Sequence, residues 1–166
     1  TKNMAEKQAK KKEISEFKNF PEFLAQYQAK KTLQQVFIYV SQDSFEFDLV
    51  TETYRTELTS SGEPLEVVVY VAETGDFEKL FSEMFNFSMF SSQKLLIIRS
   101  GSDFFKSILT AGKKEMYDSF RRNIANLAEK VYVLLHYDAK DIPAKLSNLF
   151  DNRIKKIKSR NFYADE

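Results

Sequence analysis

Four short apolar runs, rich in β-branched and aromatic residues, constrain the fold of this sequence more than any other feature. They are QVFIYV (35–40), EVVVYVA (66–72), KLLIIRS (94–100) and KVYVLLHYD (130–138). Because almost every position in each run is apolar, both faces of each strand are expected to be buried, as in a parallel sheet. Segments with helical spacing separate the runs, so strands and helices alternate along the chain.

The alternation predicts an α/β fold. Helices are expected between the strands, at residues 45–59, 76–85, 113–129 and 143–150. A charged segment from Arg153, RIKKIKSRNF, is predicted as a fifth strand at the edge of the sheet, where lysines discourage aggregation. Right-handed crossovers between these units give a three-layer sandwich with a mostly parallel five-stranded sheet.

The N-terminal segment precedes the first strand and differs from the rest. Residues 1–13 are polar and rich in lysine, so they are expected to form a frayed helix or a tail. Apolar residues then recur at helical spacing from Ile14 to Tyr27, and Pro21 is expected to open a helical stretch that ends near Lys30.

Composition excludes several kinds of site. The chain has 166 residues and a formal charge of +1, so no global field argues for nucleic acid or an acidic membrane. The absence of cysteine excludes disulfides, thiol catalysis and cysteine-based zinc sites. No apolar run approaches the roughly 20 residues of a membrane span, and the N-terminus has no signal-peptide pattern. One cytoplasmic domain is therefore expected.

The expected carboxyl ends of the strands lack the residues that bind nucleotides. The stretch SQDSFEFD (41–48) has neither the glycines nor the lysine of a phosphate-binding loop. The third strand ends in Arg99 and Ser100, where a hydrolytic ATPase would hold Mg²⁺ with an acidic residue. We therefore expect no catalytic residue, no metal and no cofactor in this domain.

Three aspartates at expected strand ends leave a second hypothesis open. Asp43, Asp103 and Asp138 could gather around Mg²⁺, as in a receiver-like or phosphoryl-transfer domain. A simpler interpretation is that Asp43 caps the helix expected from Phe45 and that Asp138 caps a turn. The only histidine, His136, lies within an expected strand and is interpreted as a packing residue with one hydrogen bond.

A third hypothesis concerns basic residues near the end of the sequence. Together with the lysine-rich tail, they could contact a nucleic-acid backbone; a solvated edge strand explains the same charges. These residues are Arg153, Lys155, Lys156, Lys158 and Arg160.

The stretch FNFSMF (85–90) places Met89 and Phe90 in a connection between helix and strand. The preceding helix has one apolar stripe that is expected to face the sheet: Phe77, Leu80, Phe81, Met84 and Phe85. If that helix continues, Met89 and Phe90 project from its outer side; if the chain turns at Asn86 or Ser88, they fold beneath it. An exposed pair would be an anchor for a pocket on a partner.

The order of three sequence blocks resembles the N-terminal domain of the delta subunit of the bacterial DNA polymerase III clamp loader. The blocks are QVFIYVSQDSFEFD (35–48), FEKLFSEMFNFSMFSSQKLLIIRS (77–100) and KVYVLLHYDAKDIPAKLSNLF (130–150). The likeness covers about Gln35 to Phe162. It implies a P-loop-like fold similar to that of AAA+ ATPases, with a degenerate nucleotide site.

The resemblance also assigns a clamp-binding element, whose general form in the family is Gln, apolar, small or acidic, Leu, Phe. The five places are taken, in that order, by Asn86, Phe87, Ser88, Met89 and Phe90. Met is a near-isosteric substitute for Leu, whereas Asn is one methylene shorter than Gln. A further departure is Ser41, which stands where the family usually has Gly after the first strand.

The function implied by the resemblance is binding rather than catalysis. The domain would be a non-hydrolytic part of the DNA polymerase III holoenzyme, a nucleotidyltransferase complex, and would bind and help open the ring-shaped sliding clamp, the beta subunit, during DNA replication. Other clamp-loader subunits and, indirectly, DNA would be partners of the full-length protein, and a membrane would not. Residues 1–33 would form the tail and helical segment, 34–162 the clamp-binding domain, and 163–166 the start of a linker to helical lid and collar domains.

Overall fold

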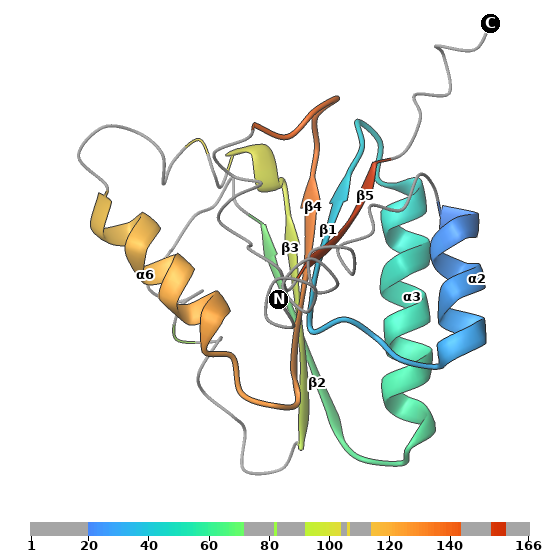
Figure 1. Cartoon of the computed structure of the whole chain (residues 1–166). Coiled ribbons are helices and arrows are strands. Elements are labelled where there is room, and N and C mark those ends of the chain that lie inside the picture. Colours follow the sequence, from blue (N-terminus) through green and yellow to red (C-terminus); the bar gives the residue numbers. More distant parts are fainter. Residues whose placement is uncertain are drawn as a thin grey trace, which may run out of the picture.

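The computed structural model describes residues 20–71, 82, 92–103, 106, 114–143 and 154–158. Their helices and strands are, in chain order, α2 (Phe20–Lys30), β1 (Val36–Val40), α3 (Phe45–Ser60), β2 (Leu65–Val71), β3 (Gln93–Arg99), α6 (Lys114–Ala125), β4 (Val131–Tyr137) and β5 (Ile154–Lys158). The strands pair in parallel in the order β2-β3-β4-β1-β5. Helix α6 covers one face of the sheet, and α2 and α3 cover the other (Figure 1). The predicted α/β class with a parallel sheet is confirmed.

The central strands are apolar at successive positions because helices cover both of their faces. All five residues of β1 are buried, and they alternate between two cores. Val36, Ile38 and Val40 pack in the core that includes residues of α6, while Phe37 and Tyr39 pack in the core that includes residues of α2 and α3. Each such side chain stabilises the fold by roughly 1.5–3 kcal/mol through removal of apolar surface from water.

Helix α2 packs into the same core as α3. The ring of Phe23, which is buried, lies 5.1 Å from the ring of Phe37 on β1. The hydroxyl of Tyr27 donates a hydrogen bond to the carboxylate of Glu57 on α3, and this bond is the main cause that raises the pKa of Tyr27 to about 12. The helical part of the N-terminal segment is therefore held to β1 by an apolar contact and to α3 by a polar one.

The connections between strands locate the edge where ligands usually bind. The chain leaves β1 toward α3 on one face, and it reaches β4, the neighbour of β1, from α6 on the other face (Figure 1). This arrangement is what right-handed crossovers require. A reversal of this kind between neighbouring strands marks the crevice, at the carboxyl ends of the strands, in which open α/β sheets bind ligands.

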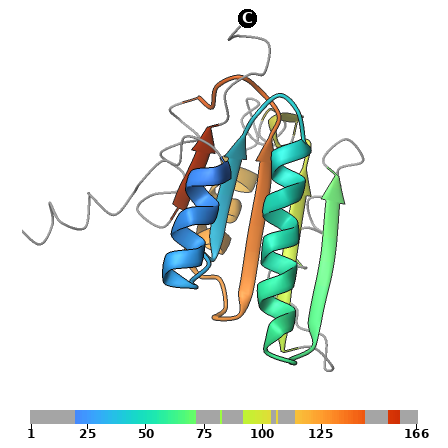
Figure 2. The same ribbon diagram turned by 90° about the vertical axis from the view of Figure 1, so that its right-hand side faces the viewer.

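Strand β2 lies at one edge of the described sheet and is not covered on the side of α3. Val67, Val69 and Val71 are 36%, 49% and 36% exposed. They share a face with Leu65, which packs in the α3-side core, because alternate residues of a strand point to the same side. Figure 2 shows β2 beside α3 with no helix in front of it. Burial on both faces, which the apolar run of β2 predicted, is therefore wrong for this strand.

The opposite edge of the described sheet is formed by β5, which pairs with β1. In this ladder Lys155 lies beside Phe37 and Lys156 beside Ile38. The two edges thus differ in composition: β5 is rich in lysine, whereas β2 has a single charged residue, Glu66. Charged residues on an edge strand oppose sheet-to-sheet association, so β2 is the less protected edge.

A lysine on the uncovered face of β2 is expected to improve solubility without unfolding the protein. Because the Val69 side chain is half exposed, Val69→Lys should change the free energy of unfolding by less than about 0.5 kcal/mol. Light scattering at high protein concentration should fall. The control is Val68→Lys, since Val68 packs against the α6-side core, and it should cost about 1–3 kcal/mol. Equal destabilisation by both variants in urea unfolding would contradict this description of the edge.

Candidate functional site

Ser41 and His136 meet at the carboxyl edge, where β1 and β4 lie side by side. Ser41 directly follows β1, and His136 is paired with Tyr39 in the ladder between the two strands. The Nε2 atom of His136 lies 3.0 Å from the carbonyl oxygen of Ser41 and 3.0 Å from its Oγ. Both residues are buried. A serine and a histidine in contact raise the question of a nucleophile and its base.

The direction of the hydrogen bonds answers that question. The hydroxyl of Ser41 donates its only proton to the carbonyl oxygen of Asp43 at 2.5 Å. Its Oγ can therefore only accept from His136, so the network assigns the proton to Nε2, which donates to both oxygens of Ser41. A base that activates serine must accept the hydroxyl proton. The pair in this arrangement fixes the position of the β1–α3 connection and does not activate a nucleophile.

The ring of His136 is held in an aromatic environment. It stacks on the ring of Phe47 with the ring centres 5.0 Å apart, and the guanidinium of Arg99 lies 5.6 Å from the centre of the same Phe47 ring. Burial lowers the pKa of His136, although its hydrogen bond with Ser41 and the nearby Asp138 favour the charged form. His136 is thus neutral at pH 7, in agreement with its interpretation as a packing residue.

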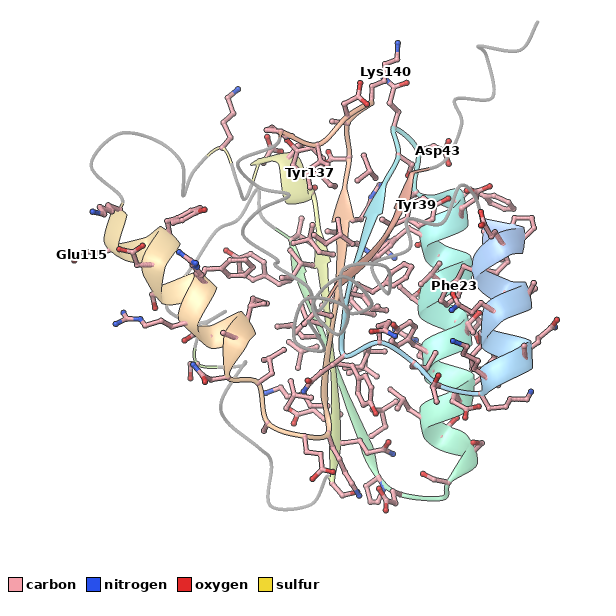
Figure 3. The ribbon with its side chains drawn as sticks, in the orientation of Figure 1. Phe23, Tyr39, Asp43, Glu115, Tyr137 and Lys140 are labelled. Atoms are coloured by element: carbon pink, nitrogen blue, oxygen red, sulfur yellow. The ribbon has the colours of Figure 1, made fainter. Side chains whose placement is uncertain are left out.

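The aspartates expected at the strand ends bind neighbouring backbone groups. The carboxylate of Asp43, which lies at the top of the β1–α3 connection in Figure 3, accepts the N–H of Phe45 at 3.1 Å. Oδ1 of Asp138 accepts the N–H and the hydroxyl of Ser102, at 2.9 and 2.7 Å. Burial alone would raise the pKa of Asp138, but the bonds from Ser102 bring it below its ordinary value. Capping by Asp43, and a local role for Asp138, agree with these contacts.

A metal cluster at this edge is not observed. In the described part of the chain, no group of three or more His, Cys, Asp or Glu side chains could hold a metal ion. The third aspartate, Asp103, lies in the helical residues 101–103 that follow β3, and its N–H donates to the carbonyl oxygen of Ser100 at 3.1 Å.

Gly101 allows the turn after β3 to lie close to β4. A Cβ atom at this position would collide with the carbonyl oxygen of His136 and with the side chain of Leu135. The backbone of this turn can therefore approach β4 only with glycine here, and the next residue, Ser102, reaches Asp138 from this position. The sequence offered a signal for this approach, because glycine is rare in the chain and Gly101 follows an apolar strand.

The β1–α3 connection leaves no place for a phosphate. It consists of residues 41–44 alone, which is short for a loop that must wrap around a phosphate. The N–H of Phe45, at the start of α3, is already bonded to Asp43, and the first turn of α3 carries Glu46 and Asp48. The N-terminus of a helix binds anions through free N–H groups and a positive dipole end. Here Asp43 accepts one of those N–H groups, and the negative charges of Glu46 and Asp48 disfavour a second anion nearby.

Arg99 is neutralised in the same region. It ends β3, and its guanidinium lies 2.6 Å from Oδ1 of Asp48 in the first turn of α3. Sequence reasoning noted Arg99 only as the residue that replaces an acid, and it missed the partner. The two residues are 51 positions apart, so only the packing of α3 on β3 brings them together.

The predicted clamp-binding residues Asn86, Phe87, Ser88, Met89 and Phe90 lie outside the described residues. The next described residue is Ser92. Its N–H donates to the carbonyl oxygen of Pro64 at 3.3 Å, and Pro64 directly precedes β2. The start of β3 is therefore at the amino end of the sheet, opposite the edge that holds Ser41 and His136.

The predicted basic contact is described in part. Lys155, Lys156 and Lys158 lie on β5, whose backbone pairs with β1 at the edge of the sheet. Arg153 and Arg160 lie outside the described residues. The structure thus brings three of these residues to one strand at the sheet edge.

Comparison of the sequence with models of known protein families and with curated proteins finds no match. The function is therefore inferred from the geometry of this chain and from the sequence resemblance. None of the helices described here is long and apolar enough to cross a membrane.

The lowered pKa of His136 predicts a loss of stability in mild acid. Unfolded histidine titrates near 6.5 and the folded residue titrates lower, so the unfolded chain binds more protons between these values. The free energy of unfolding should therefore decrease from about pH 7 to pH 5. His136→Gln should flatten this dependence in urea unfolding. Glu46, whose pKa is raised by burial, acts in the opposite direction in both proteins and cancels from the comparison. Parallel profiles for the two proteins would contradict the prediction.

The Ser41 hydroxyl is expected to contribute to stability. Ser41→Ala removes the donor to the Asp43 carbonyl and one acceptor of the His136 N–H, and it should cost about 1–2 kcal/mol in urea unfolding. The control is Ser44→Ala. Ser44 precedes α3, is exposed and makes no capping hydrogen bond with its side chain, so the change should be near neutral. Similar effects of the two variants would show that the Ser41 contacts are unimportant.

Proposed function

We propose that this chain is a clamp-loader domain of the delta type, which binds a ring-shaped sliding clamp through Met89 and Phe90 and does not hydrolyse nucleotide. The observation that carries the proposal is the closed carboxyl edge. The groups at the positions where a related ATPase would hold phosphate and Mg²⁺ are bonded to one another, as in the pairs Asp43 with Phe45 and Arg99 with Asp48.

The architecture of the sheet agrees with the proposed relationship with AAA+ ATPases. In this chain β4 is inserted between β1 and β3, and β5 lies on the other side of β1. A parallel sheet with helices on both faces is compatible with the P-loop-like fold that the sequence resemblance implies. A P-loop-like scaffold whose phosphate site is filled by its own side chains suits a protein that uses this fold for binding.

Clamp binding would use the opposite end of the sheet. Ser92 lies at the amino end, and Phe90 precedes it by two residues in the sequence. Met89 and Phe90 would enter a hydrophobic pocket of the clamp, supported by Phe87, and each would contribute roughly 1.5–3 kcal/mol of apolar transfer. Ser88 would fill the small place of the element and Asn86 would add a hydrogen bond.

Opening of the ring would need no hydrolysis in this chain. If the domain binds more tightly to a clamp that is strained at one subunit interface, binding shifts the clamp toward its open form. Such a domain would act in the cytoplasm during DNA replication, with other clamp-loader subunits and DNA as further partners of the full-length protein. The receiver-like or phosphoryl-transfer alternative is less well supported, because Asp43 and Asp138 are each bonded to backbone N–H groups.

The double variant Met89→Ala with Phe90→Ala tests the proposal. Binding to a bacterial sliding clamp, measured by calorimetry, should weaken by about 100-fold or more, since the variant truncates both side chains that the clamp pocket would bury. The melting temperature should stay within about 2 °C, because the pair is expected outside the core. Val69→Ala, a truncation at an exposed apolar site on β2, is the matched control and should retain binding. A melting temperature lower by several degrees would place the pair in the core instead.

A titration with Mg²⁺ tests the receiver-like or phosphoryl-transfer alternative. If the aspartates hold a cation, addition of Mg²⁺ should shift the amide resonances of Asp43, Asp103 and Asp138. Such shifts would overturn the proposal of a binding domain without a metal site.

A further inference from the structure

Two exposed apolar side chains on the outer side of α3 have no role in the fold or in the proposed clamp binding. Phe45 is 64% exposed and Leu49 is 37% exposed. They are four residues apart, so they are neighbours on the helix surface and form one ridge. The buried positions of α3, such as Phe47 and Tyr54, lie on the other side of the helix. The ridge therefore projects away from the core.

Acidic side chains surround the ridge. Asp43 precedes Phe45, Glu46 and Asp48 lie in the first turn of α3, and Glu52 follows Leu49 by three residues, which makes it a neighbour on the helix surface. Asp48 pairs with Arg99. Glu46 is partly buried, with Oε2 enclosed and without a hydrogen-bond partner, so the exposed rim consists of Asp43, Glu52 and the Asp48–Arg99 pair. Its formal charge is −2, in a chain whose total is +1. The apolar ridge thus has a rim of one sign, which the composition of the whole chain does not suggest.

We propose that this ridge and its acidic rim bind a basic amphipathic helix of a partner protein. Phe45 and Leu49 supply the apolar contact, and helices that bind in this way present apolar residues at i, i+3 or i+4, and i+7. The exposed carboxylates of Asp43, Asp48 and Glu52 select lysine or arginine beside those residues, because an acidic partner would leave like charges opposed. The charge of the partner helix and the spacing of its apolar residues therefore both contribute to specificity.

The ridge lies at the opposite end of the sheet from the start of β3. Phe45 and Leu49 lie at the N-terminal end of α3, which follows the carboxyl end of β1, while Ser92 lies at the amino end of the sheet (Figure 1). A basic helix on α3 and a clamp at the other end would not compete for the same surface. The site goes beyond the proposed function, and it stands or falls separately from it.

A defined peptide tests the site in the full chain. The probe is a synthetic, fluorescein-labelled peptide of about 14 residues, with Leu at the i, i+4 and i+7 places and Lys on both flanks. Fluorescence anisotropy should show saturable binding that weakens several-fold between about 50 mM and about 250 mM salt. The same peptide with Glu in place of Lys should not bind. Binding of both peptides alike would overturn the proposal.

Variants of the ridge and the rim separate the two contributions. Phe45→Ser with Leu49→Ser should weaken binding of the basic peptide by about tenfold or more, and Glu52→Lys by several-fold. Val69→Ser, at the other exposed apolar site, is the control and should bind as the unchanged protein does. Circular dichroism verifies that the variants remain folded. Unchanged affinity of the ridge variant, or an equal loss in the control, would overturn the proposal.

Two further measurements test whether the ridge is open to a partner and separate from the clamp-binding element. In the absence of peptide, the ridge variant should leave the amide resonances of residues 1–19 unchanged; shifts there would show that the lysine-rich N-terminal segment of the same chain occupies the ridge, and would overturn the proposal. The ridge variant should bind a sliding clamp as the unchanged protein does. Loss of clamp binding in this variant would also overturn it, because the two sites would then not be separate.

Discussion

The burial of β1, β3 and β4 on both faces is the constraint on which the rest of this structure depends. The central strands of a parallel sheet are apolar on both faces, so they must hold a helix layer on each side. Here α6 covers one side, and α2 and α3 cover the other (Figure 1). The alternating residues of β1 join the two cores, with Phe37 in one and Ile38 in the other. Because the strands are parallel, the carboxyl ends of β1, β3 and β4 come to one edge, and the chemistry of that edge follows from the fold.

At that edge several polar groups of the protein bind one another, although Oε2 of Glu46 is buried without a hydrogen-bond partner. His136 donates to Ser41, Asp138 accepts from Ser102, and Arg99 pairs with Asp48. A nucleotide-binding site needs the opposite condition, with N–H groups and a cation left available for phosphate. These internal bonds use groups that a phosphate site would need, which supports the proposed role of the domain in binding rather than hydrolysis.

Much of the fold could be predicted from the sequence, because a strand that is buried on both faces has a continuous run of apolar residues. The strands observed at 36–40, 93–99 and 131–137 lie within one residue of the predicted runs, and α3 begins at Phe45 as expected. The exposure of Val67 and Val69 could not be read in this way, because an edge strand can be as apolar as a central one and its place in the sheet depends on the order of all strands. The pairing of Arg99 with Asp48 and the close approach at Gly101 likewise arise from packing between distant segments. The role of Met89 and Phe90 stays a prediction.

The unequal edges of the sheet limit how these molecules can associate. Strand β2 offers an apolar rim with one charge, while β5 carries Lys155, Lys156 and Lys158. The β2 edges of two molecules can pair through a twofold axis. Both β2 edges are then occupied, and only the β5 edges, which are rich in lysine, remain open. Head-to-tail stacking of β2 on β5, which could continue without end, would have to bury those lysines. Within the described sheet, the lysines of β5 therefore oppose continued association through the strand edges.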